Sequence, residues 1–117
     1  MHYVLLIYAS EEEYAKLSRE QLGAIMQGHS MFATDVQQRN LLTGGHPLQS
    51  THTATTVRLR NGKTMTTDGP FAETKEQLAG FYVLNCKDLD EAVALAIKIP
   101  DAQFGAIEIR PVMEISM

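Results

Sequence analysis

Two stretches of the chain are apolar at almost every position, and they constrain the fold more than any other feature. Residues 3–8 read Tyr-Val-Leu-Leu-Ile-Tyr, and residues 78–84 are nearly as apolar. Side chains of a strand alternate between the two faces of a sheet, so a strand that is apolar throughout is covered on both faces. Both stretches are therefore predicted to be interior strands of one sheet.

A long helix is predicted between these strands. Ser18 with Gln21 three residues later forms a capping box, and the helix is expected to end near Asn40. Apolar residues at three- and four-residue spacing would form its buried stripe, and His29 falls within that stripe. The stripe comprises Leu22, Ile25, Met26, His29, Phe32, Ala33 and Val36.

A second helix is predicted to start after the capping residue Asp88 and to end before Pro100. A final strand is expected over residues 106–115. The stripe expected to be buried on the second helix comprises Leu89, Ala92, Val93, Ala96 and Ile97.

The middle of the chain, residues 53–67, is predicted to form a β-hairpin. Thr, Val and Leu alternate with polar residues there, and Asn61-Gly62 is a strong signal for a two-residue turn. With that turn Arg60 faces Lys63, and counting outward places Thr55 opposite Asp68. The preceding Gly44-Gly45 is expected to allow a sharp turn or a close approach of two backbones.

This order of elements predicts a single α+β domain over residues 1–117: strand, helix, strand, inserted hairpin, strand, helix, strand. Without the hairpin it is the split βαβ arrangement of ferredoxin-like domains. Two helices cover one face of such a sheet, yet the interior strands are apolar on both faces. A second copy of the chain is the simplest cover for the other face, so a homodimer is predicted.

Composition excludes several classes of partner. The net charge of −4 without a basic cluster disfavours nucleic acid and anionic membranes, and no apolar run is long enough to span a bilayer. The single cysteine, Cys86, excludes an intrachain disulfide and is expected to be core filler. A cytoplasmic location is the plain interpretation.

The stretch from Asp68 to Glu76, Asp-Gly-Pro-Phe-Ala-Glu-Thr-Lys-Glu, is the most conspicuous local motif. Proline restricts its own backbone and that of the preceding residue, so Gly69-Pro70 makes a defined corner directly after a carboxylate. Further charged side chains crowd the next positions. This corner is therefore predicted to contribute to a functional site.

With this motif, the following Gly80-Phe81-Tyr82 and the Glu108-x-Arg110-Pro111 ending, the chain resembles the YCII-related proteins. It is most similar to the branch named for its Asp-Gly-Pro-Phe signature. The resemblance implies a dimeric α/β barrel, a scaffold shared with small-molecule enzymes such as muconolactone isomerases. It also implies a helix histidine paired with an aspartate, which would be His29 and Asp68. The resemblance further suggests an association with extracytoplasmic-function sigma factors, as is often found for members of this family.

The predicted catalytic residues are Asp68 and His29, because a carboxylate fixes the tautomer of an imidazole and raises its basicity. The alternative is a core histidine and an aspartate that caps the Gly69-Pro70 turn. Glu73, Lys75 and Glu76 could orient a polar ligand, or they could form solvent-screened ion pairs or reach a partner chain. The predicted ligand-binding residues are Gly69, Pro70, Phe71, Glu73, Lys75, Phe81 and Tyr82.

No metal or redox cofactor is predicted. His46 and His52 could join His29 or Asp68 around a metal, but their spacing matches no metal-binding motif. The expected function is binding of an unknown small molecule, with cofactor-independent isomerase- or lyase-like acid–base chemistry. The alternative is a noncatalytic dimeric module that binds a metabolite or a protein and has a regulatory role, for which the resemblance suggests a link to a sigma factor.

Overall fold

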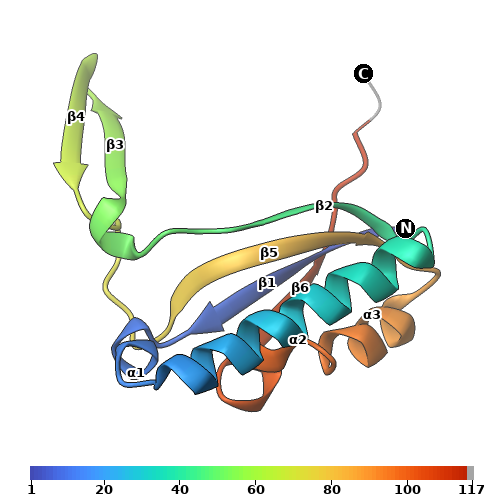
Figure 1. Ribbon diagram of the computed structural model, residues 1–117. Coiled ribbons are helices and arrows are strands. Elements are labelled where there is room, and N and C mark those ends of the chain that lie inside the picture. The colour runs from blue at the N-terminus through green and yellow to red at the C-terminus, as the bar shows by residue number, and fades with distance from the viewer. Residues whose placement is uncertain (116–117) are drawn as a thin grey trace.

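A computed structural model describes residues 1–115 and shows an α+β fold of the ferredoxin-like type (Figure 1). The long helix α2 and the shorter helix α3 lie on one side of a four-stranded antiparallel sheet. The elements in chain order are β1 (His2–Ala9), α1 (Glu11–Ala15), α2 (Arg19–Gln38), β2 (Leu42–Pro47), the 3₁₀ turn η1 (Thr51–Thr53), β3 (Thr55–Arg60), β4 (Lys63–Asp68), β5 (Gln77–Asn85), α3 (Leu89–Ala96), the 3₁₀ turn η2 (Pro100–Gln103) and β6 (Ala106–Pro111).

The sheet has the strand order β2-β5-β1-β6, so the two strands predicted to be interior are its two central strands. Leu5 pairs with Tyr82, and Ile7 pairs with Gly80 across the centre. On β1 every second residue is buried under the helices. The residues between them, such as Val4, lie on the other face of the sheet and are partly exposed. The helix-facing side of the sheet therefore carries the core.

Helix α2 begins as predicted, with the capping box between Ser18 and Gln21 present in both directions. Its residues Phe32 and Val36 are fully covered by the sheet, and the core also includes Leu84 and the free Cys86. No helix among residues 1–115 is both long enough and apolar enough to cross a membrane.

Two expectations about the elements are wrong, and one helix was not predicted. The final strand ends at Pro111 rather than at residue 115, because only Val112 continues the backbone pairing, to His2. The stripe predicted for α3 is only partly right: Ala92 and Ala96 are buried as predicted. Leu95 is buried with them, whereas Leu89, Val93 and Ile97 are exposed. The five-residue helix α1, which Ser10 caps, was not predicted.

The inserted hairpin has the predicted register, with Arg60 opposite Lys63 and Thr55 opposite Asp68. Asn61 and Gly62 both have positive φ, as the two-residue turn requires. Strands β3 and β4 form a separate two-stranded sheet that rises on the side of the main sheet opposite the helices, and the C-terminal segment rises on that same side (Figure 1).

Candidate active site

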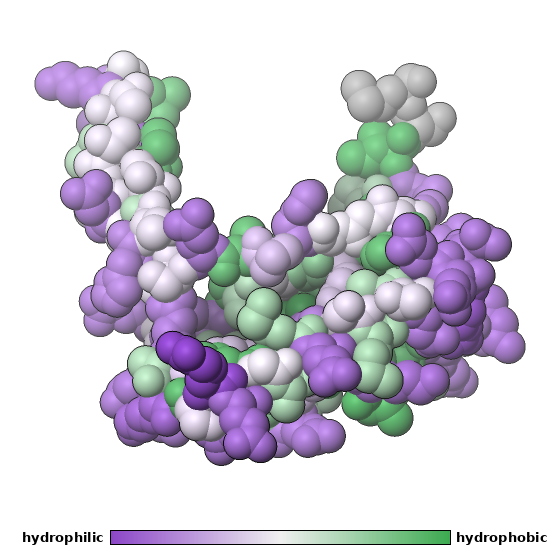
Figure 2. All heavy atoms as spheres, viewed as in Figure 1, coloured by the Kyte–Doolittle hydropathy of each residue, from purple (hydrophilic) through white to green (hydrophobic). Residues whose placement is uncertain are grey.

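A cavity of roughly 720 Å³ lies between α2 and the β2–β5 edge of the sheet. Figure 2 shows the hollow near the middle of the molecule, with hydrophobic residues inside it. Most of the lining is apolar, with Leu22, Ile25 and Met26 on the helix side and Ile7 and Ala79 on the strand side. This size and character are typical of small-molecule binding sites.

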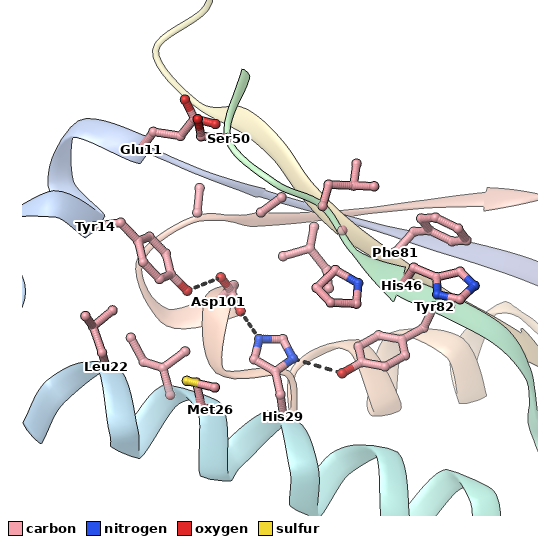
Figure 3. A pocket seen from close by; sticks show the side chains of 18 of the residues that line it. Glu11, Tyr14, Leu22, Met26, His29, His46, Ser50, Phe81, Tyr82 and Asp101 are labelled. Atoms are coloured by element: carbon pink, nitrogen blue, oxygen red, sulfur yellow. Dashed lines mark hydrogen bonds and ion pairs between the residues drawn. The ribbon is translucent and has the colours of Figure 1, made fainter. Parts of the chain in front are cut away.

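Four polar side chains form one hydrogen-bonded chain along the wall of the cavity (Figure 3). His29 on α2 is central: its Nε2 lies 2.5 Å from Asp101 Oδ1, and its Nδ1 lies 2.9 Å from the Tyr82 hydroxyl. The Tyr14 hydroxyl donates to the other oxygen of Asp101 at 2.9 Å. The Asp101 side chain is only 2% exposed, whereas that of His29 is 26% exposed, so the imidazole is the more accessible member of the pair.

A glycine on α2 permits the pairing of His29 with Asp101. A Cβ at Gly28 would lie 2.6 Å from Pro100 Cγ, so only glycine lets the turn η2 pack this closely against the helix. Pro100 is the first residue of η2, where its fixed φ suits the start of a helical turn. Asp101 follows it and is thereby held beside His29.

The strand edge is also built on glycine. Gly45 has a φ of +150°, and a Cβ there would lie 2.6 Å from the carbonyl oxygen of Phe81. This is the close approach of two backbones expected at Gly44-Gly45, and it brings β2 against β5 at the point where Tyr82 enters the cavity.

The surroundings of these groups set their protonation states. Burial alone would raise the pKa of Asp101, but hydrogen bonds from His29 and Tyr14, with the charge of His29, lower it. Burial, the hydrogen bond to Asp101 and its charge raise the pKa of Tyr14. Burial and the same carboxylate raise the pKa of Tyr82. At neutral pH the hydrogen-bonded chain therefore contains the ionised carboxylate of Asp101 and the protonated phenols of Tyr14 and Tyr82.

These states fix the roles of the imidazole nitrogens. An ionised Asp101 can only accept, so Nε2 of His29 carries a hydrogen and donates it. In the neutral ring Nδ1 is then the basic nitrogen, and the Tyr82 hydroxyl donates to it. A carboxylate that orients a histidine in this way makes the opposite nitrogen a candidate proton acceptor.

The structure brings together only part of the predicted site. His29, Phe81 and Tyr82 line this cavity, whereas Asp68 does not, so the predicted pairing of His29 with Asp68 is not formed within the chain. The partner of His29 is Asp101. Of the remaining predicted residues, Asp68, Gly69, Pro70 and Glu73 line a second hollow, and Phe71 and Lys75 are exposed outside both.

The second hollow adjoins the first, because Glu11, Ala15 and Ser50 line both. Glu11 holds the loop between them: its carboxylate accepts from the backbone N–H of Thr51 at 2.8 Å and from the Thr51 hydroxyl at 2.7 Å. The Asp68 corner is fixed mainly through its backbone, with Gly69 N–H donating to the Ala54 carbonyl at 2.7 Å. The Asp68 side chain itself is exposed.

Sequence reasoning missed Tyr14, Asp101 and Glu11. Asp101 did offer a weak signal, an aspartate directly after the proline that ends the second helix region, whereas Tyr14 offered none. His46 lines the first cavity and His52 the second, so they do not meet. Among residues 1–115 no three His, Cys, Asp or Glu side chains converge as a metal site.

Comparison with known proteins gives two matches. The YCII-related domain matches residues 1–116 of the chain. An uncharacterized protein of Rhizobium meliloti (strain 1021) is 37% identical over 113 residues, which cover 95% of this chain and 91% of that protein. Both matches extend over nearly the whole chain, so they include the cavity and the second hollow.

Proposed function

Since the chain belongs to the YCII-related family, and a hydrogen-bonded histidine lines its cavity, we propose that it is a small-molecule enzyme using cofactor-independent acid–base chemistry. The observation that carries this proposal is the hydrogen-bonded chain from Tyr14 through Asp101 and His29 to Tyr82. A buried carboxylate paired with a histidine that reaches an apolar cavity is the kind of oriented, perturbed group that clusters at active sites. It suits a base that works near neutral pH.

The reaction class follows from the atoms available. His29 Nδ1 would take a proton from carbon next to a carbonyl group, and Asp101 would balance the charge of the resulting imidazolium. The Tyr82 hydroxyl, released from Nδ1, would donate a hydrogen bond to the developing enolate oxygen. Return of the proton to another carbon completes an isomerisation, and departure of a leaving group completes an elimination.

We also assign the chain to the Asp-Gly-Pro-Phe branch of the family. The signature from residue 68 onward supports this, and its Gly69 has a φ of +97°, a conformation that favours glycine. The rival function is a noncatalytic binding or regulatory module. The cavity argues against a module that binds a protein through its surface, because such a module has no need of the cavity. A module that holds a metabolite would use the same cavity, and the hydrogen-bonded pair of His29 and Asp101 favours the enzyme over it.

A homodimer is part of the proposal. The radius of gyration is 16.3 Å, whereas a compact chain of this length has about 13 Å. The excess comes from the hairpin, whose Val57 and Leu59 share one face and are 62% and 65% exposed. Figure 2 shows hydrophobic atoms on the side of the hairpin that faces the gap above the sheet. Native mass spectrometry would give twice the chain mass, and a monomer at micromolar concentration would refute the dimer.

The catalytic proposal can be tested before the substrate is known. Protein in D₂O is incubated with a panel of small ketones, lactones and esters, and loss of the proton next to the carbonyl is followed by NMR. We expect accelerated exchange for some panel members, and His29→Gln should slow it by about 10²–10⁴-fold, the usual contribution of a general base. Exchange that survives this substitution, or no exchange with any compound, would contradict the proposal.

A further inference from the structure

The lining of the His29 cavity carries charge of one sign. Among residues 1–115, the carboxylates lining it are Glu11 and Asp101, and neither lysine nor arginine reaches it. Any positive charge that His29 acquires is matched by Asp101 at 2.5 Å. Glu11 lies toward one end of the cavity, next to Ser50 (Figure 3). A ligand entering this space meets no fixed cation.

The polar side chains that hydrogen-bond to one another lie along one wall of the cavity, whereas Glu11, Ser50 and His46 line it elsewhere. Tyr14, Asp101, His29 and Tyr82 follow one another along one wall, whereas Leu22 and Met26 on α2 present apolar surface beside them (Figure 3). This wall offers the Tyr82 hydroxyl and the His29 ring to one polar group of a ligand. The rest of a bound molecule would contact hydrocarbon.

From this distribution of charge we propose that the site takes an uncharged, largely apolar molecule with a single carbonyl or hydroxyl group and rejects carboxylates. The inference rests on the proposed function and adds the substrate class. A carboxylate would lose its hydration in an apolar cavity without a cation to replace it, which costs several kcal/mol in general. The Asp101 and Glu11 charges would add repulsion.

A matched pair of ligands tests the inference. 2-Naphthamide and 2-naphthoate have nearly the same shape and differ in charge, and both can be titrated into the full chain by calorimetry at pH 8. Binding near the proposed base is checked by the NMR shift of the His29 ring. We expect 2-naphthamide to bind at least tenfold more tightly than 2-naphthoate.

The two possible failures differ in kind. If both ligands shift the His29 signal with similar affinity, or 2-naphthoate binds more tightly, the charge inference is overturned while the cavity remains a binding site. If neither ligand shifts the His29 signal, the cavity is not the binding site, and the proposed function fails with the inference.

A pair of substitutions sharpens the test by reversing the charge. Met26 and Met31 are both exposed residues of α2, but only Met26 lines the cavity. Met26→Lys should strengthen 2-naphthoate binding at least fivefold, because its ammonium supplies the missing cation. Met31→Lys carries the same change in net charge away from the cavity and should leave both affinities unchanged. Equal effects of the two substitutions would contradict the inference.

Discussion

The cavity around His29 and the hollow around Asp68 lie side by side, but they hold their carboxylates differently. Asp101 is buried, and its two oxygens accept hydrogen bonds from His29 and Tyr14. Asp68 is exposed, and the hydrogen bonds at its corner involve the backbone of Gly69. The first arrangement removes the charge of Asp101 from water and places it against the imidazole of His29. The second leaves a charge in water at a rigid turn, where solvent weakens its influence.

The difference teaches that a conspicuous motif and a reactive group need not coincide. The Asp-Gly-Pro-Phe corner is conspicuous because proline and glycine impose a local backbone geometry. A perturbed, oriented carboxylate requires burial and partners from distant segments. We therefore expect the chemistry to depend on Asp101 and the corner to act in shaping the neighbouring hollow.

The largest effect is expected from Asp101→Asn. The amide keeps the size of the carboxylate but cannot stabilise an imidazolium at His29, so carbonyl-dependent proton exchange should fall by about 10²–10⁴-fold. Exchange rates measured by NMR in D₂O would show this. Circular dichroism confirms that the variant is folded. If Asp101→Asn exchanged protons as fast as the wild type, the base would not depend on Asp101. The proposed difference in role between Asp101 and Asp68 would then be wrong.

The next largest effect is expected from Gly28→Ala, which tests how the fold brings His29 and Asp101 together. Gly28→Ala adds a Cβ that would lie 2.6 Å from Pro100, so η2 must shift and move Asp101 relative to His29. Overpacking of this kind costs about 1–3 kcal/mol of unfolding free energy. In the same helix, Gly23→Ala meets no atom within 4 Å.

The Gly23→Ala control should therefore stabilise the protein by up to about 1 kcal/mol through helix propensity. Urea denaturation of both variants gives the comparison, and exchange should slow only in Gly28→Ala. If both glycines accept alanine equally well, close packing at Gly28 is not what holds Asp101 in place.

Much of the fold could be predicted because its signals are local. Each of these signals lies within a few consecutive residues: the apolar runs of β1 and β5, the capping box of α2 and the Asn61-Gly62 turn. The final strand was predicted too long and the α3 stripe was only partly right, because apolar residues near a chain end or on a short helix need not be buried. The α3 residues Leu89 and Ile97 are exposed despite their spacing.

The site was only half predictable for the opposite reason. His29 and Tyr82 lie in strongly patterned elements, but Asp101 lies 72 residues from His29 in a short 3₁₀ turn, where no periodic pattern exists. Tyr14 lies in a five-residue helix, which is too short to show a stripe. The pairing of such residues is decided by tertiary packing, and Asp68 was chosen in place of Asp101 because its motif is local.

A smaller effect concerns stability at low pH. The folded pKa of Asp101 is lowered, so its ionised form stabilises the fold above the unfolded pKa of about 3.9. This contribution is lost as the pH falls through the folded pKa, and each unit of lowering is worth about 1.4 kcal/mol. Denaturation between pH 5 and pH 2 should show the loss in the wild type.

Two variants isolate that contribution. Tyr14→Phe removes one of the hydrogen bonds that lower the pKa, so it should show a smaller loss, and Asp101→Asn should lack the contribution altogether. The measurement is the unfolding free energy of the wild type and the two variants as the pH falls. The loss should be largest in the wild type, smaller in Tyr14→Phe and smallest in Asp101→Asn. If the wild type and Asp101→Asn lose stability in parallel below pH 4, the carboxylate is not held by His29 and Tyr14 in solution.

The smallest effect is expected from Asp68→Asn, which tests whether the Asp68 side chain binds a ligand, caps the turn or does neither. The carboxylate is exposed and the turn is held through the Gly69 backbone, so unfolding free energy should change by no more than about 0.5 kcal/mol. Affinity for 2-naphthamide should be unchanged as well, because Asp68 does not line the His29 cavity. Lost affinity with unchanged melting would restore Asp68 as a pocket residue, whereas lost stability with intact binding would show that its side chain caps the turn. Either result would show that the Asp68 carboxylate, like that of Asp101, has a role of its own.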